Sequence, residues 1–176
     1  FIMGVFFIDE AQHRAAHVVH YTRLTSTTRR SLTNSSSNSN ILLCNFGSFD
    51  KKLSGSTICF QGFIAAWGNN AGATTLNLHL GGSYNSSNYV VSGGTGTGYP
   101  IAHYNYTADS YYKICVISGA ITGHTGTGSQ SVLVAHRTAN GNSDRPFNII
   151  NPNASDDTRI ENSMGGSSLS VWEMNL

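Results

Sequence analysis

The sequence predicts an all-β protein, specifically an antiparallel, jelly-roll-like β-sandwich, and three observations support this prediction. Of the 176 residues, 75 are Ser, Thr, Asn or Gly, and only 19 are charged. Short runs rich in Ile, Val, Leu, Phe and Tyr interrupt the polar stretches, and such runs are typical of strands. Almost every gap between the runs holds Gly, Asn or Ser, which favour turns. Many short strands joined by turns are the pattern of a sandwich or jelly roll.

The predicted strands are distributed along the whole chain. The run at 74–80 alternates strictly, so Leu76, Leu78 and Leu80 share one face. In the run at 131–137 apolar residues occur on both faces, which indicates a strand that is covered on both sides. Helical patterning is confined to residues 9–19, where at most one turn is expected. The strand-forming runs are 1–8, 15–24, 41–46, 57–67, 74–80, 99–106, 111–118, 131–137, 146–150 and 168–174.

Three connecting segments have distinctive compositions. Residues 25–40 have the lowest complexity in the chain, and we expect a surface loop there. The Gly-rich segments 92–98 and 122–128 share the sequence Thr-Gly-Thr-Gly. Neither segment has the Gly-Lys-Ser/Thr ending of a phosphate-binding loop or the GxGxxG fingerprint of a dinucleotide site, so both are interpreted as turns.

Length and charge restrict the classes of function. The length fits one domain, residues 1–176, and the apolar start resembles the first strand of a fragment cut from a longer chain. No run approaches the roughly 20 apolar residues of a membrane span, so membrane insertion is not expected. The net charge is +1, and Lys and Arg form no cluster of the kind that binds nucleic acid.

The three cysteines, Cys44, Cys59 and Cys115, each lie in an apolar run and show no CxxC spacing. We interpret them as buried free thiols that pack like small apolar side chains, with a Cys44–Cys59 hairpin disulfide as the alternative. His and Cys partners at zinc-ligand spacing are absent, so neither a metal nor any other cofactor is expected.

Catalytic patterns are also weak, and no catalytic residue is assigned. No serine lies in a GxSxG motif. A glycoside hydrolase needs two carboxylates flanking one bond. The adjacent acids of Asp9-Glu10 and of Asp156-Asp157 would point to opposite faces of a strand.

Three histidines, His13, His17 and His20, would share one face of a helix, as metal ligands do. On a strand only His13 and His17 share a face. We expect ordinary surface or core histidines, although in a trimer one inward histidine would become three around the axis.

The tyrosines indicate a binding site. Seven of the eight fall between Tyr84 and Tyr112, interleaved with Asn and His. A tyrosine ring can stack on the C–H face of a sugar while neighbouring amides bind its hydroxyls. The alternative is that these tyrosines form a core or a subunit interface. The predicted carbohydrate site is Trp67, Tyr84, Asn85, Asn88, Tyr99, His103 and Tyr104.

The C-terminal region carries a resemblance to a known family. The run Arg145-Pro146-Phe147-Asn148-Ile149-Ile150-Asn151-Pro152-Asn153 leads through a polar segment to Gly165-Gly166-Ser167-Ser168-Leu169-Ser170-Val171-Trp172-Glu173-Met174. This ending, about 30 residues long, resembles the receptor-binding tip domains of bacteriophage tail fibres and tailspikes. The resemblance implies a homotrimeric β-sandwich head at the distal end of a virion fibre, bound to host cell-surface polysaccharide. It carries over no catalytic motif, and the His-x-His pattern of metal-threaded tips is absent.

The resulting hypothesis is a receptor-binding domain that attaches a phage to a host surface glycan. Three weak sugar sites on one trimeric head would give useful avidity. The alternative is a non-binding trimerisation cap, or a capsid or decoration jelly roll. A glycan hydrolase and a cellular lectin or cytokine-like trimer remain further alternatives.

Overall fold

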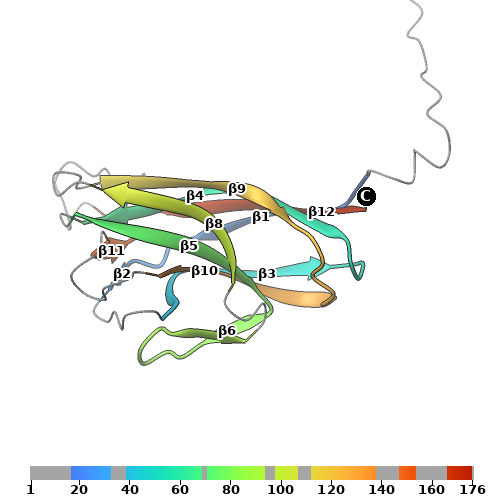
Figure 1. Ribbon diagram of the computed structural model, residues 1–176, viewed down its shortest axis with the longest axis horizontal. Helices are drawn as coiled ribbons and strands as arrows, with labels where there is room; N and C mark the ends of the chain where they lie inside the picture. The colour runs from blue at the N-terminus through green and yellow to red at the C-terminus, as the bar shows by residue number, and fades with distance from the viewer. Residues whose placement is uncertain are drawn as a thin grey trace, which may run out of the picture.

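The computed structural model describes residues 17–32, 39–68, 71–93, 98–106, 112–137, 147–153 and 166–175. Within these ranges the chain forms strands and connecting turns without a helix. Two antiparallel sheets pack face to face, and a small hairpin projects beside one of them (Figure 1). The predicted all-β, antiparallel fold class is confirmed.

The first sheet contains four long strands and two short ones. The long strands are, in spatial order, β1 (His17–Ser26), β12 (Ser167–Asn175), β4 (Thr57–Trp67) and β9 (Tyr112–Ile121). The short strands β11 (Ile149–Ile150) and β2 (Arg30–Ser31) continue this sheet next to the C-terminal end of β4. The second sheet is ordered β3 (Ile41–Lys51), β10 (Gly128–Arg137), β5 (Gly72–Leu80) and β8 (Tyr99–Tyr106). The hairpin consists of β6 (Gly82–Tyr84) and β7 (Val91–Gly93).

The strand order is that of a jelly roll. Counted along the chain, the eight long strands pair as 1-8-3-6 in the first sheet and 2-7-4-5 in the second. The chain therefore crosses repeatedly between the two sheets, as two interlocked Greek keys do. The hairpin β6–β7 is an addition to this plan, inserted between β5 and β8.

The structure corrects some of the sequence predictions. Strands β4 and β8 coincide with the predicted runs 57–67 and 99–106. Residues 17–19 belong to strand β1, so the helical turn does not extend to them. The predicted loop at 25–40 is partly wrong, because residues 25 and 26 end β1 and Arg30–Ser31 forms β2 against β11. The run 1–8 and residues 33–38 lie outside the described residues.

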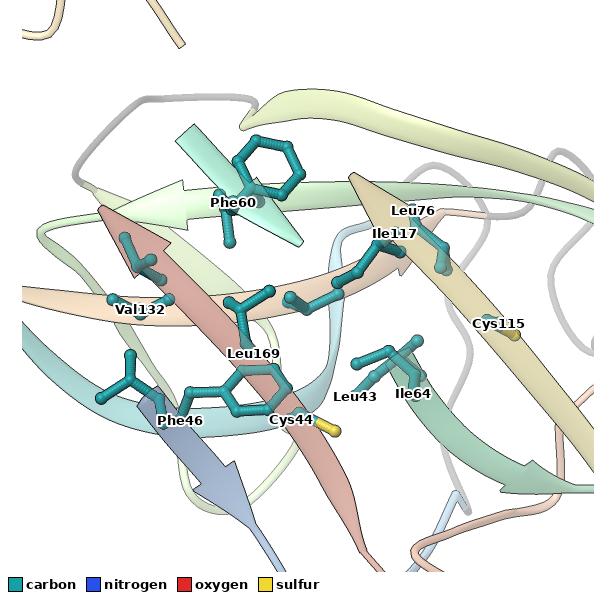
Figure 2. Packing of buried hydrophobic residues seen from close by; sticks show 14 of the residues in the cluster. Leu43, Cys44, Phe46, Phe60, Ile64, Leu76, Cys115, Ile117, Val132 and Leu169 are labelled. Carbon is teal, nitrogen blue, oxygen red and sulfur yellow. The ribbon is translucent and has the colours of Figure 1, made fainter. Parts of the chain in front are cut away.

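The main core lies between the two sheets. Figure 2 shows apolar side chains of both sheets meeting there, for example Phe46 and Leu76 of the second sheet and Ile64 and Leu169 of the first. Leu76, Leu78 and Leu80 of β5 are all buried in this cluster, as their alternation predicts. Burying an apolar side chain of this size contributes about 1.5–3 kcal/mol to stability. The burial of these three leucines therefore fixes the register of strand β5.

The cysteines are free, which excludes the alternative disulfide. Cys44 and Cys115 are buried in the main core as expected, but the expectation is wrong for Cys59, which is only half-buried. Burial raises the pKa of Cys44 and of Cys115 to about 11. Both thiols therefore stay protonated near neutral pH and pack as small apolar groups.

A second, smaller cluster of buried apolar residues lies on the outer face of the second sheet. Leu42 of β3 and Leu133 and Ala135 of β10 are buried there beneath Val91 and the partly buried Tyr89 of the hairpin segment. This confirms that β10 is covered on both sides. The hairpin segment is attached through backbone hydrogen bonds from Leu42 N–H to the Tyr89 carbonyl and from Val91 N–H to the Asn40 carbonyl, each 2.9 Å long. The hairpin is thus fixed beside β3, where it forms one wall of a cleft.

Candidate ligand-binding cleft

A cleft of about 280 Å³ lies between the hairpin and the segment that joins β1 to β3. Two tyrosines of the hairpin segment form one wall, and residues of β3 and of the segment 26–30 form the rest. The lining is mixed, with phenol, hydroxyl, amide and guanidinium groups beside two leucines. The lining residues are Ser26, Thr28, Arg29, Arg30, Leu42, Leu43, Asn45, Tyr84 and Tyr89.

The two tyrosines of the cleft are held in place by a tight turn. The rings of Tyr84 and Tyr89 are stacked, with centroids 6.3 Å apart and planes inclined by 13°. Tyr89 adopts a positive φ of 58°, and its N–H donates to the Asn85 carbonyl at 2.7 Å. A left-handed conformation costs a non-glycine residue roughly 1–2 kcal/mol. The turn and the Leu42–Tyr89 backbone bond offset that cost and keep the Tyr89 ring over the cleft.

Arg30 lies on the opposite wall of the cleft and contacts the ring of Tyr89. Its guanidinium carbon lies 4.3 Å from the centroid of the Tyr89 ring, and one terminal nitrogen donates to the Leu43 carbonyl at 3.1 Å. Burial lowers the pKa of Arg30. The guanidinium nevertheless stays charged near neutral pH, because the ordinary pKa of arginine lies several units above neutrality. The cleft therefore contains a partly desolvated positive charge stacked on an aromatic ring.

An adjoining hollow of about 400 Å³ is also lined by Tyr84. It shares Asn45 and Tyr84 with the cleft, and hydroxyl groups and glycines make up most of its remaining lining. Tyr84 is 37% exposed and lines both depressions. The two depressions thus share one exposed aromatic ring, and a polymer with more than one sugar ring could contact both. The remaining lining residues of the hollow are Gly47, Ser48, Gly82, Ser83, Ser131 and Leu133.

Three of the predicted carbohydrate-site residues lie together on the hairpin segment, and only Tyr84 lines the cleft. Asn85 and Asn88 belong to the exposed turn that follows β6. The Asn85 side-chain oxygen accepts the Ser87 N–H at 2.8 Å, and the Asn88 oxygen accepts the Val90 N–H at 3.2 Å. These oxygens shape the turn, which leaves the two exposed amide nitrogens as the groups that could donate to a ligand.

The other four predicted residues lie on the main sandwich, and none of them lines the cleft or the adjoining hollow. Tyr99 and Tyr104 pack against the main core, and the Tyr104 hydroxyl donates to the Val116 carbonyl of β9. His103 is exposed, and its Nδ1 lies 3.2 Å from the Thr75 hydroxyl. Trp67 ends β4 between β9 and β11.

Sequence reasoning missed two important groups of the cleft, Arg30 and Tyr89. Tyr89 lies inside the tyrosine-rich segment 84–112, and its position next to Asn88 is a signal for it. Arg30 has no comparable signal, since it lies in the low-complexity segment 25–40, far from Tyr89 in the sequence. The local sequence around Arg30 or around Tyr89 does not indicate that these two residues, which are nearly sixty positions apart, line one cleft.

Metal binding finds no support in the described ranges, where no three His, Cys, Asp or Glu side chains gather as a possible metal site. Of the three histidines considered above, His13 lies outside the described residues, and His20 packs its ring 5.1 Å from that of Phe49. Among the described segments there is also no helix long and apolar enough to cross a membrane.

Comparison with known proteins yields a distant structural neighbour. Neither a protein-family model nor a curated protein sequence matches the chain. One matching solved structure is titled "Crystal structure of the T13 IBDV viral particle reveals a missing link in icosahedral viruses evolution". The TM-score is 0.39 and the identity 8%, over 88% of this chain and 35% of the other. The chain thus spans about a third of the length of that viral protein.

Proposed function

We propose that this jelly roll is a carbohydrate-binding attachment domain whose ligand lies in the cleft beside Tyr84 and Tyr89. The single observation that carries the proposal is the pair of stacked tyrosines, which borders a cleft lined by hydroxyl, amide and guanidinium groups. Aromatic rings bind the C–H faces of sugars, and the surrounding polar groups bind their hydroxyls. A jelly roll is compatible with this role, since lectin domains use it, but the fold alone does not specify a function.

In its full form the proposal is a phage receptor-binding domain at the distal end of a tail fibre or tailspike, attached to host cell-surface polysaccharide. The C-terminal resemblance supports this setting. Three copies on a homotrimeric head would present three such clefts, so that weak individual sites would hold a repeating polymer tightly. Neither described acidic residue, Asp50 or Glu173, lines the cleft, and the proposed role is binding without cleavage.

The test is binding of the purified, fluorescently labelled protein to intact bacteria and to their extracted polysaccharides, with its mass measured by light scattering. Strain-selective binding that free polysaccharide competes away is the expected result. Tyr84→Ala should abolish it, because this substitution removes the exposed aromatic ring that lines both depressions. A reducing-end assay on the same polysaccharides should show no cleavage.

Tyr21→Ala is the matched control. Tyr21 is 56% exposed on β1, its hydroxyl lies 3.2 Å from Ser170 Oγ, and it does not line the cleft. Each variant removes one exposed tyrosine side chain. Only Tyr84→Ala should lose binding, because Tyr84 lines the cleft and Tyr21 does not. Equal binding by the two variants, with both folded, would refute the assignment of the cleft. Failure of the wild-type protein to bind any strain or polysaccharide would refute the function.

A second candidate function is that of a structural subunit, such as a trimerisation cap or a capsid or decoration jelly roll. The observation in its favour is the apolar outer side of β9, where Ile114 is 44% and Val116 is 60% exposed. Exposed apolar groups that lie close together often mark contacts between proteins. This alternative predicts that Val116→Ser lowers the mass of the assembly, whereas Tyr84→Ala leaves the assembly unchanged.

A further inference from the structure

The charge of the cleft is unbalanced, and this bears on which glycans it accepts. Two arginines, Arg29 and Arg30, line it, and no described carboxylate does. The two acidic residues of the described ranges are occupied elsewhere: Asp50 pairs with Lys52, and Glu173 lies 3.9 Å from Lys51 Nζ. The cleft is thus a positive site in a chain whose net charge is only +1.

Arg30 is the centre of this imbalance. A guanidinium has five N–H donors. One terminal nitrogen of Arg30 binds the Leu43 carbonyl, whereas the other, Nη1, is buried and has no hydrogen-bond partner. A buried, unsatisfied donor on a charged group is costly, and native proteins rarely keep one without a reason. A ligand anion in the cleft would supply the missing countercharge.

The surroundings of Arg30 favour an anionic group attached to a ring. The guanidinium is held by the Leu43 carbonyl on one side and by the face of Tyr89 on the other, so its orientation is fixed before a ligand arrives. A fixed guanidinium suits a carboxylate or phosphate, whose oxygens match its donors. The stacked rings of Tyr84 and Tyr89 lie beside it and suit the ring that carries the anion.

We propose that the cleft selects acidic glycans, in which a carboxylate or phosphate group on the sugar pairs with Arg30 while the sugar ring packs against Tyr84 and Tyr89. This inference rests on the proposed carbohydrate-binding function and specifies its ligand class. Neutral glycans of the same backbone bind at least about tenfold more weakly, since they leave the guanidinium without a countercharge.

The experiment uses a panel of bacterial polysaccharides bearing uronic acids, sialic acids or phosphate groups, together with neutral ones. Each acidic polymer is tested in its native form and after carboxyl reduction or dephosphorylation. The wild-type protein should bind native acidic polymers, lose about tenfold or more in affinity for the treated forms, and weaken as salt rises. Arg30→Gln should reduce binding by a similar factor.

Arg23→Gln is the matched control, because it removes the same charge from β1, where the Arg23 Nε donates to Ser168 Oγ outside the cleft. Equal binding of native and treated polymers would overturn the acidic specificity and leave the carbohydrate-binding function intact. Binding of no polymer at all would overturn both. If Arg30→Gln fails to fold, the comparison of polymers on the wild-type protein and its salt dependence still decide the question.

Discussion

Replacing Glu173 by Gln should destabilise the sandwich strongly. Glu173 lies on β12 and is fully buried, yet it binds the turn between β3 and β4. Its two oxygens accept the N–H groups of Lys52 and Leu53, each at 2.7 Å, and one of them also accepts the Ser56 hydroxyl. Lys51 Nζ lies 3.9 Å from the same carboxylate. The carboxylate thus ties the two sheets together at one end.

The magnitude follows from the groups that the substitution leaves without partners. In the Glu173→Gln variant an NH₂ group replaces one carboxylate oxygen, so the N–H of Lys52 or of Leu53 faces another donor, at about 1–3 kcal/mol. Buried Lys51 also loses its countercharge, and breaking a buried pair costs about 3–5 kcal/mol. Burial lowers the pKa of Lys51, so in the variant this lysine can lose its proton instead of remaining an unpaired buried charge. Most of the second cost is then avoided, and we expect a total of about 3 kcal/mol. For a domain of this size that equals a loss of roughly 6–12 °C in Tm.

The stability that Glu173 contributes to the folded state should depend on pH. Burial by itself raises the pKa of Glu173, but the hydrogen bonds from Ser56, Lys52 and Leu53 and the charge of Lys51 outweigh it, and the net pKa lies below 4.5. The native state therefore binds the proton less readily than the unfolded chain does. The stabilisation is complete above pH 4.5 and is lost as the pH falls through the native pKa. The difference between wild type and variant should shrink accordingly in acid.

Thermal unfolding followed by circular dichroism, at neutral pH and in a series of acidic buffers, measures the loss of stability in Glu173→Gln and its dependence on pH. Asp50→Asn is the control, because it removes one carboxylate that is exposed and paired with Lys52. Its melting temperature should stay close to that of the wild type, since exposed ion pairs contribute little to stability. The reasoning is refuted if Glu173→Gln melts within about 2 °C of the wild type at neutral pH, or if Asp50→Asn is equally damaging.

Three further predictions concern other buried groups. Ellman's reagent should label Cys59 first in the native protein, since the other two thiols are buried, and all three should react after unfolding. Gly98→Ala should cost about 2–5 kcal/mol in chemical denaturation, because φ is +81° and the new Cβ would lie 2.5 Å from His79 Nε2. Gly55→Ala, at a φ of +77° with open space around it, should cost only about 1–2 kcal/mol. Burial lowers the pKa of His79, whose ring nitrogens have no hydrogen-bond partner. Stability should therefore fall as the pH drops below about 6.5, and His79→Phe should flatten that dependence.

Each of these predictions has a clear contrary result. Rapid labelling of three thiols in the native protein would show that the core opens readily. Equal costs for the two glycine substitutions would show that backbone strain alone, without the clash against His79, sets the penalty at Gly98. An unchanged pH profile in the His79→Phe variant would mean that this imidazole does not couple protonation to folding.

Much of the fold could be predicted from local patterns. Leu76, Leu78 and Leu80 alternate because a strand places every second side chain on the same face, and the structure buries all three. Apolar residues on both faces of 131–137 predicted a strand covered on both sides, and the second core under the hairpin confirms it. Such patterns report which residues are buried in a strand. They do not report which strands pair, because pairing depends on contacts between distant segments.

The candidate site shows what local sequence patterns do not predict, namely which of several similar tyrosines line a cleft. Of the tyrosines in the tyrosine-rich segment, Tyr84 lines the cleft, whereas Tyr99 and Tyr104 pack against the main core. Local sequence cannot separate a tyrosine on a projecting hairpin from one on an edge strand of the sandwich.

The sequence by itself determined that the chain would fold into strands, where most of them lie, and that its cysteines would be free thiols, two of them buried as expected. The tertiary structure decided the jelly-roll strand order and the docking of β6–β7 on β3. It also decided the meeting of Arg30 with Tyr89, which are 59 positions apart. The physical reason is that periodicity and turn propensity act over a few residues. A cleft, in contrast, forms only where the pairing of distant strands brings separate walls together.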